Sequence, residues 1–185
     1  MHASDGTAPR GNEPRGPGGP EIWVRGPVGE PEPPRQPYEE DRQLVVSARQ
    51  FSWVATHGGA GASTLATVFG GHDAGRNWPR PDQGEPGSVL LVGRTHAAGL
   101  DAVSHTLDIF RRGDAPPGLD LDAIVLVADA PGRLPRQLTQ RVKVINSVID
   151  VYRVPWIPAW RTGELTVPLP RDIASLARLT GRTAP

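Results

Sequence analysis

Short apolar runs alternate with helical patterns through the later part of the chain. Residues 51–56 form a β-rich run that ends in glycines. Residues 88–92 and 123–128 are continuous apolar runs, which are typical of strands buried in a parallel sheet. A fourth strand is expected at residues 151–154, where a proline ends the apolar run.

Helices are predicted between these strands and after the last one. One spans residues 63–69, one ends before Gly113, one begins near Pro135, and a last short one ends at Gly181. Residues 70–87 are rich in Gly, Pro, Asp and Asn and are predicted to be a loop. Strands that alternate with helices indicate an α/β fold, a small parallel sheet with helices on both faces. The apolar positions at helical spacing are Leu100, Val103, Leu107 and Phe110, then Leu138, Val142, Ile145 and Ile149, then Ile173, Leu176 and Leu179.

The first part of the chain differs in composition from the rest. Residues 1–47 contain nine prolines and seven glycines and show almost no apolar periodicity. Such a segment buries too little apolar surface to offset its ordering entropy, so a disordered tail at 1–47 is expected before a domain at 48–185. Within this tail, Trp23 and Arg25 stand in a short apolar patch that is a candidate for docking a partner protein. The alternative is that the patch packs on its own domain.

Composition narrows the classes of function. Lys plus Arg and Asp plus Glu both total 20, so net charge gives no reason to expect nucleic acid or an acidic membrane as a partner. The absence of cysteine excludes a disulfide scaffold, a thiolate metal site and a cysteine nucleophile. No apolar run reaches the roughly 18 residues of a membrane span, and no signal peptide is recognised. A cytoplasmic protein is therefore expected.

A glycine-rich turn between the first strand and the first helix is the most specific feature of the sequence. In this context glycines allow positive φ, consecutive N–H groups form an anion nest, and the helix N-terminus adds partial positive charge. The turn is therefore a candidate site for a nucleotide or another phosphate ligand, and the alternative is a tight connection that binds nothing. Its residues are His57, Gly58, Gly59, Ala60, Gly61, Ala62, Ser63 and Thr64.

This turn resembles the deviant phosphate loop of the MinD/ParA family of ATPases, which reads roughly Lys-Gly-Gly-x-Gly-Lys-Thr-Thr. By this resemblance His57 stands at the signature lysine, Ala62 at the phosphate-loop lysine and Ser63 at the Mg²⁺-binding hydroxyl. The only lysine of the chain, Lys143, belongs to a later helix. Because the phosphate-loop lysine neutralises charge in phosphoryl transfer, its loss predicts a P-loop NTPase-like fold without efficient hydrolysis. The TadZ/CpaE-like group of the same superfamily also lacks the second lysine.

Two further positions bear on a nucleotide site. The strand at 88–92 runs into Gly-Arg-Thr, where the MinD/ParA family has an Asp-x-Asp pair. Arg94 follows that strand at its carboxyl end, where open α/β sheets bind ligands, and is the best placed substitute for the missing lysine. Ser63 and Asp129 are the expected Mg²⁺ residues if ATP or another nucleotide binds. The alternative for Asp129 is an ordinary turn residue.

A second resemblance covers roughly residues 50–165. Its motifs look like those of an actinobacterial family of unknown function. They are Trp53…His57-Gly-Gly-Ala-Gly…Ser63-Thr-Leu65, Trp78-Pro79, Val89-Leu-Leu-Val-Gly-Arg-Thr-His96, Asp129-Ala-Pro-Gly-Arg-Leu-Pro135 and Val154-Pro-Trp-Ile157…Trp160-Arg161. The tail motif Trp23-Val-Arg-Gly-Pro27 also resembles that family. The resemblance brings no assigned activity.

Two tryptophans near the end of the last strand, Trp156 and Trp160, have three alternative roles. They can stack on a ligand base, bind a partner, or cover the sheet edge. The first function considered is a regulatory or positioning adaptor that binds a nucleotide or another phosphate ligand without efficient hydrolysis. The second is a protein-interaction module that docks through the Trp23 tail and these tryptophans. The third is a weak ATPase homodimer completed in trans by an arginine.

Overall fold

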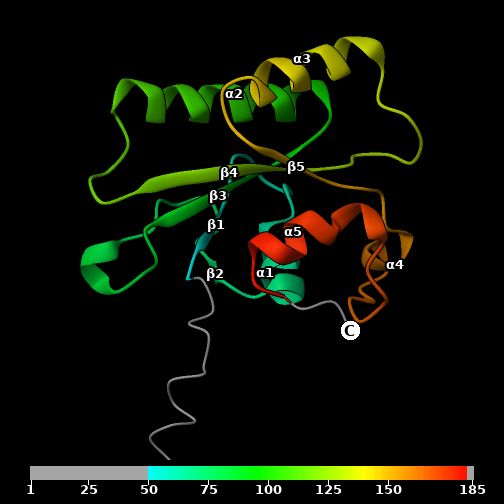
Figure 1. The fold of residues 1–185 in the computed structure, drawn as a ribbon, viewed down its shortest axis with the longest axis horizontal. Coiled ribbons are helices and arrows are strands. Elements are labelled where there is room, and N and C mark those ends of the chain that lie inside the picture. Colours follow the sequence, from blue (N-terminus) through cyan, green and yellow to red (C-terminus); the bar gives the residue numbers. More distant parts are fainter. Residues whose placement is uncertain (1–49, 183–185) are drawn as a thin grey trace, which may run out of the picture. The chain divides into compact units, whose positions relative to one another are not determined.

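Five parallel strands form a single sheet in the computed structural model, which describes residues 50–182 (Figure 1). The spatial order is β2-β1-β3-β4-β5. The chain moves outward from β1 to β2, then returns to the other side of β1 for β3 and continues to β5. This reversal makes the carboxyl ends of β1 and β3 a topological switch point, where such sheets open a crevice. The strands are β1 (Ser52–Ala55), β2 (His72–Asp73), β3 (Ser88–Arg94), β4 (Asp120–Val127) and β5 (Val151–Val154).

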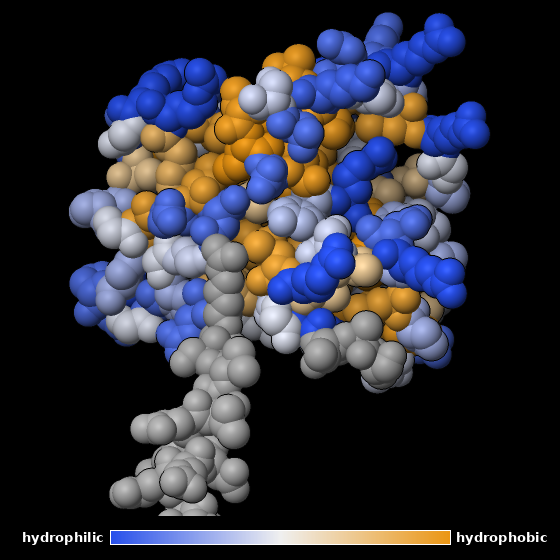
Figure 2. All heavy atoms as spheres, in the orientation of Figure 1, coloured by the Kyte–Doolittle hydropathy of each residue, from blue (hydrophilic) through white to orange (hydrophobic). Residues whose placement is uncertain are grey.

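Helices cover both faces of the sheet. Figure 1 shows α2 and α3 in one layer and α1, α4 and α5 in the other. On the face shown in Figure 2, apolar residues gather between the upper helices and the sheet, while hydrophilic residues occupy the outer margin. The helices are α1 (Ala62–Phe69), α2 (Ala97–Arg112), α3 (Arg136–Asn146), α4 (Pro158–Arg161) and α5 (Ala174–Leu179), with short 3-10 turns at Pro81–Gln83 and Arg171–Ile173.

Alternation along the central strand β3 divides the core into two clusters. Leu90 and Val92 pack in the cluster beneath α1 and α5, whereas Val89 and Leu91 pack in the cluster beneath α2 and α3. All four side chains are at most 1% exposed. A strand that is apolar on both faces is what a sheet covered on both sides requires. The predicted α/β fold with a parallel sheet between two helical layers is therefore confirmed.

The predicted loop at 70–87 contains a strand that the sequence did not indicate. β2 is only two residues long, too short for a period of two to be recognised. It is held to the edge of β1 by the N–H of His72, which donates to the carbonyl of Phe51 at 2.9 Å. Gly71 precedes it with φ +88° and lies directly against the Phe51 ring, so that a Cβ there would overlap the ring. A left-handed, close-packed position of this kind favours glycine.

Several boundaries differ from those predicted. β4 begins at Asp120, before the apolar run at 123–128, because its first residues pair with the start of β3. Pro135 is the N-cap of α3, not part of its first turn. Trp160 lies on the one-turn helix α4, a helix that is not among those predicted from the sequence. Pro158 occupies its first turn, where no N–H is needed.

The predicted tail at 1–47, with Trp23 and Arg25, lies outside the described residues and stays a prediction. The same holds for the boundary at residue 48. Among the helices of residues 50–182, none combines the length and the apolar character that crossing a bilayer requires.

Candidate functional site

The loops that follow β1 and β3 lie next to each other at the switch point of the sheet. The two strands pair in parallel, with Ala55 opposite Val92, so their carboxyl ends meet at the same edge. The glycine-rich turn leaves β1 there and Arg94 ends β3. The fold therefore brings together the two segments that the sequence had singled out separately.

His57 joins these two segments. Its Nε2 accepts a hydrogen bond of 3.0 Å from the backbone N–H of Arg94, and its Nδ1 lies 2.9 Å from the carbonyl oxygen of Gly58. Since a carbonyl accepts only, Nδ1 must carry the proton and Nε2 must be bare, which is a neutral imidazole. Both ring nitrogens are thus occupied by the backbone. In this arrangement His57 positions Arg94, and its ring has no nitrogen left to donate to a phosphate.

The Arg94 side chain is held across the site by two backbone carbonyls. Its Nε donates to Gly59 at 3.1 Å, and its Nη1 donates to Ala128 at 3.0 Å. Burial lowers the pKa of Arg94 below its usual value, the charge of Arg161 lowers it further, and Asp129 acts in the opposite direction. The Arg94 guanidinium is therefore half-buried and lies near a second cation, Arg161.

The glycine-rich turn has the backbone conformations that a close approach to an anion requires. Gly59 and Gly61 have φ values of +73° and +106°, and Gly61 caps α1 at its N-terminus. The first N–H groups of a helix have no intrahelical acceptor and are open to an external one. Ala60 and Ala62, in contrast, are 1% and 4% exposed and belong to the core cluster under α1. Position 62, where the resemblance places the phosphate-loop lysine, is a core position here.

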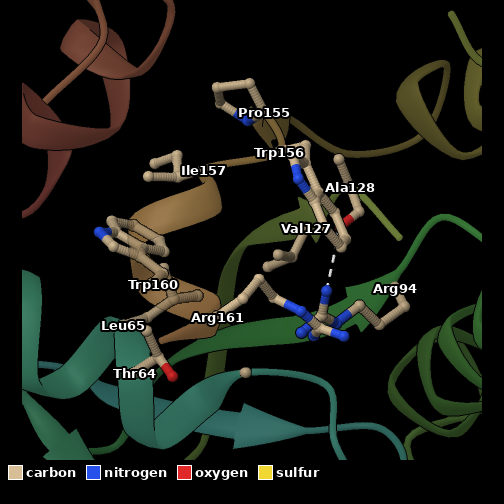
Figure 3. Close-up of a pocket in the computed structure, with 11 residues that line it drawn as sticks. Thr64, Leu65, Arg94, Val127, Ala128, Pro155, Trp156, Ile157, Trp160 and Arg161 are labelled. Carbon is tan, nitrogen blue, oxygen red and sulfur yellow. Dashed lines mark hydrogen bonds between the residues drawn. The ribbon is translucent and has the colours of Figure 1, made fainter. Parts of the chain in front are cut away.

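A cavity of about 240 Å³ lies between this turn and the segment that follows β5 (Figure 3). Thr64 lines it, whereas Ser63 is exposed and does not. Arg94 and Arg161 enter it from β3 and from α4. Its wall combines these two cations with apolar and aromatic surface, and it is called the arginine cavity below. The lining residues are Gly61, Thr64, Leu65, Arg94, Val127, Ala128, Pro155, Trp156, Ile157, Trp160 and Arg161.

Both tryptophans predicted near the last strand line this cavity. The guanidinium carbon of Arg161 lies 4.9 Å from the centroid of the Trp156 ring, a cation–π distance. Trp160 packs on the core cluster under α1, and its indole Nε1 is buried without a hydrogen-bond partner in the described residues. Both side chains thus form part of a cavity wall, a position from which either could contact a ligand.

The two residues expected to bind Mg²⁺ do not line the cavity. The backbone N–H of Asp129 donates to the buried Thr95 hydroxyl at 3.1 Å, while its own carboxylate side chain is exposed. Within residues 50–182 no cluster of three or more His, Cys, Asp or Glu side chains suits a metal ion. Ser63 uses its carbonyl to accept a hydrogen bond from Thr67, within the helix α1.

Arg161 is the charged residue of the cavity that was not predicted as a binding residue from the sequence. It reaches the cavity through the fold, because α4 follows β5 while Arg94 ends β3, two strands away in the sheet. No local pattern connects two such positions. The sequence offered two weak signals, the Trp160-Arg161 pair within the family-like motif and the nearby Trp156, on which the Arg161 guanidinium stacks.

A second cavity, of about 660 Å³, adjoins the first along the carboxyl ends of β4 and β5. The two share Ala128, Pro155 and Trp156 as lining residues. Arg153 and Asp172 add charged groups to its wall. Trp156 therefore stands between two hollows, one of them lined by two arginines.

No curated protein matches the chain. The model of one protein family, described as a family of unknown function (DUF6668), matches residues 50–177. The matched region includes all five strands, the glycine-rich turn and every residue that lines the arginine cavity. Since this match covers well over half of the sequence, the chain belongs to that family of unknown function.

Proposed function

We propose that this protein binds a nucleotide or another phosphate ligand at the glycine-rich turn and Arg94, without efficient hydrolysis, and acts as a regulatory or positioning adaptor. The observation that carries the proposal is the Arg94 guanidinium, which the carbonyls of Gly59 and Ala128 fix at a cavity that opens beside the start of α1. Arginine is suited to phosphate because its planar fork donates two parallel hydrogen bonds.

The dimensions of the site support a phosphate group in the arginine cavity, with room beside it for a larger ligand. Ligand pockets generally enclose about 300–1,000 Å³. The arginine cavity, at about 240 Å³, falls below that range, but the adjoining hollow adds about 660 Å³. A nucleotide would need both, whereas a small phosphate compound would need only the first.

The polar groups at the site support binding more than turnover. Phosphoryl transfer requires a metal ion and a cation on the transferred phosphate. Ala62 is buried in the core, and neither Ser63 nor Asp129 lines the arginine cavity. The proposal therefore assigns the site to ligand sensing, with Trp156 and its neighbours beside the ligand as the surface through which a partner protein reads the bound state.

The experiment is titration calorimetry of the full chain with ATP, ADP and GTP in the presence of Mg²⁺. Arg94→Gln is the test variant. Arg141→Gln is its matched control, since Arg141 also donates to a backbone carbonyl, that of Ala97, but lies on α3 and does not line the cavity. We expect binding to weaken about tenfold to a hundredfold in the Arg94 variant only, as is usual for a charge-assisted hydrogen bond. No binding of any nucleotide or of pyrophosphate at millimolar concentration would overturn the proposal.

A further inference from the structure

Two guanidinium groups face one cavity although they come from different elements. Arg94 ends β3 and Arg161 ends α4, and Figure 3 shows both side chains converging on the middle of the cavity. The charge of Arg161 is near enough to lower the pKa of Arg94. Like charges held together cost free energy unless an anion lies between them.

Neither cation has a salt-bridge partner among the described residues. In residues 50–182 no carboxylate forms a salt bridge with Arg94 or Arg161, although salt bridges occur elsewhere, as between Arg141 and Asp101. The charge of Asp129 favours the charged form of Arg94, but Asp129 is exposed and makes no salt bridge with another described residue. Within the part of the chain that the structure describes, the site therefore has two positive charges and no carboxylate paired with either of them.

Within residues 50–182, most of the N–H donors of this pair have no acceptor. A guanidinium has five N–H donors. Arg94 uses its Nε and Nη1 on the carbonyls of Gly59 and Ala128, which leaves its Nη2 group without a partner in the described residues. Arg161 makes no hydrogen bond with the described residues, and its guanidinium stacks over Trp156. Stacking on an aromatic face fixes the plane of a guanidinium but leaves the N–H edge available.

We infer that Arg94 and Arg161 together clamp a compact phosphate anion with at least two negative charges, such as a diphosphate group, in the arginine cavity. This inference rests on the proposed phosphate-binding function and adds a second binding residue to it. Arg161 supplies the cation that the buried position 62 does not. Because Arg161 belongs to α4, the anion fastens the segment that carries Trp156 and Trp160 to the end of β3.

The test is calorimetry with inorganic pyrophosphate and with inorganic phosphate, at constant ionic strength, on the full chain. The variants are Arg161→Gln, which removes the charge, and Arg161→Lys, which keeps the charge but loses the fork. Arg171→Gln is the matched control, since Arg171 is also exposed and near the C-terminus but does not line the cavity. We expect pyrophosphate to bind more tightly than phosphate. We expect at least tenfold weaker pyrophosphate binding in Arg161→Gln, an intermediate loss in Arg161→Lys and no change in Arg171→Gln.

A titration with ADP distinguishes the source of the diphosphate. Equal affinities for ADP and pyrophosphate mean that the anion alone is recognised, and tighter ADP binding means that the nucleoside adds contacts; both agree with the clamp. Wild-type binding that is lost in Arg94→Gln but is the same in Arg161→Gln and Arg171→Gln overturns the clamp and leaves the proposed function standing. Absence of wild-type binding to every phosphate compound overturns both.

Discussion

The backbone N–H of Arg94 donates a hydrogen bond of 3.0 Å to Nε2 of His57. This contact joins the turn after β1 to the last residue of β3. Gly99 of α2 packs closely against this contact. A Cβ at Gly99 would lie 3.1 Å from Nε2 of His57 and would overlap the carbonyl of Arg94. His96 lies against His57 with ring centroids 5.3 Å apart, and its Nδ1 accepts from the N–H of Gly99 at 2.9 Å. The position of Arg94 thus depends on residues that do not line the cavity.

Replacing His57 by alanine should loosen this junction. The variant leaves the Arg94 N–H without its acceptor, which should lower the free energy of unfolding by about 1–2 kcal/mol and weaken phosphate binding. His57→Gln retains an acceptor oxygen and should recover part of both losses. Chemical denaturation and calorimetry measure the two effects. His105→Ala is the control, because His105 is exposed on α2 and should change stability by less than about 0.5 kcal/mol. Unchanged stability in His57→Ala would show that the bond contributes nothing.

The same contact can be observed directly in the tautomer of His57. Only one neutral tautomer satisfies both contacts. In it, Nδ1–H donates to the carbonyl of Gly58 and the unprotonated Nε2 accepts from the N–H of Arg94. Long-range ¹H–¹⁵N correlation spectra at neutral pH should therefore show the proton on Nδ1. A proton on Nε2 would contradict the observed junction.

Gly99 should not tolerate even one methyl group. Alanine is favoured over glycine in a helix by about 1 kcal/mol, so propensity alone would predict a gain in stability. Here the added Cβ meets the backbone of Arg94, and overpacking of this kind typically costs about 1–3 kcal/mol. We expect Gly99→Ala to have a lower melting temperature and weaker phosphate binding. Gly58→Ala serves as the control for stability, since Gly58 has open space around it and no positive φ. A more stable Gly99→Ala would show that α2 shifts freely from β3.

Much of the fold could be predicted from local signals. The apolar runs at 88–92 and 123–128 indicated buried strands, and Gly113 ends α2 in the left-handed conformation that its sequence position suggested. β2 could not be predicted, because its two residues have no periodicity and depend on pairing with the edge of β1. A strand created by its partner has no signature of its own.

The candidate site was predicted in part from the sequence. What the sequence could not predict is the direction in which each side chain points. The glycine pattern located the turn, and the end of an apolar strand located Arg94. The same pattern could not show that Ala62 faces the core, that both nitrogens of His57 are occupied, or that Thr64 lines the cavity while Ser63 does not. Those facts depend on packing between elements that are far apart in sequence.

Trp156 should contribute to phosphate binding only through Arg161. Cation–π stacking at an exposed site is worth about 0.5–1 kcal/mol, so Trp156→Leu should weaken pyrophosphate binding about twofold to fivefold. Trp156→Phe keeps an aromatic face and should bind almost as the wild type does. In an Arg161→Gln background, Trp156→Leu should have no further effect, and a double-mutant cycle by calorimetry measures this coupling. Additive losses would mean that Trp156 contacts the ligand itself.

Introducing a lysine at position 62 should not create an ATPase. Ala62 is 4% exposed within the core under α1, and a lysine ammonium buried there costs at least about 2 kcal/mol unless the helix shifts to release it. Ala62→Lys should therefore lower the melting temperature without producing ATP turnover above background. Thr67→Lys adds the same charge at an exposed position of the same helix and controls for charge alone. Wild-type stability together with ATP hydrolysis in Ala62→Lys would mean that position 62 faces the ligand, and that a lysine there is all that the site needs for hydrolysis.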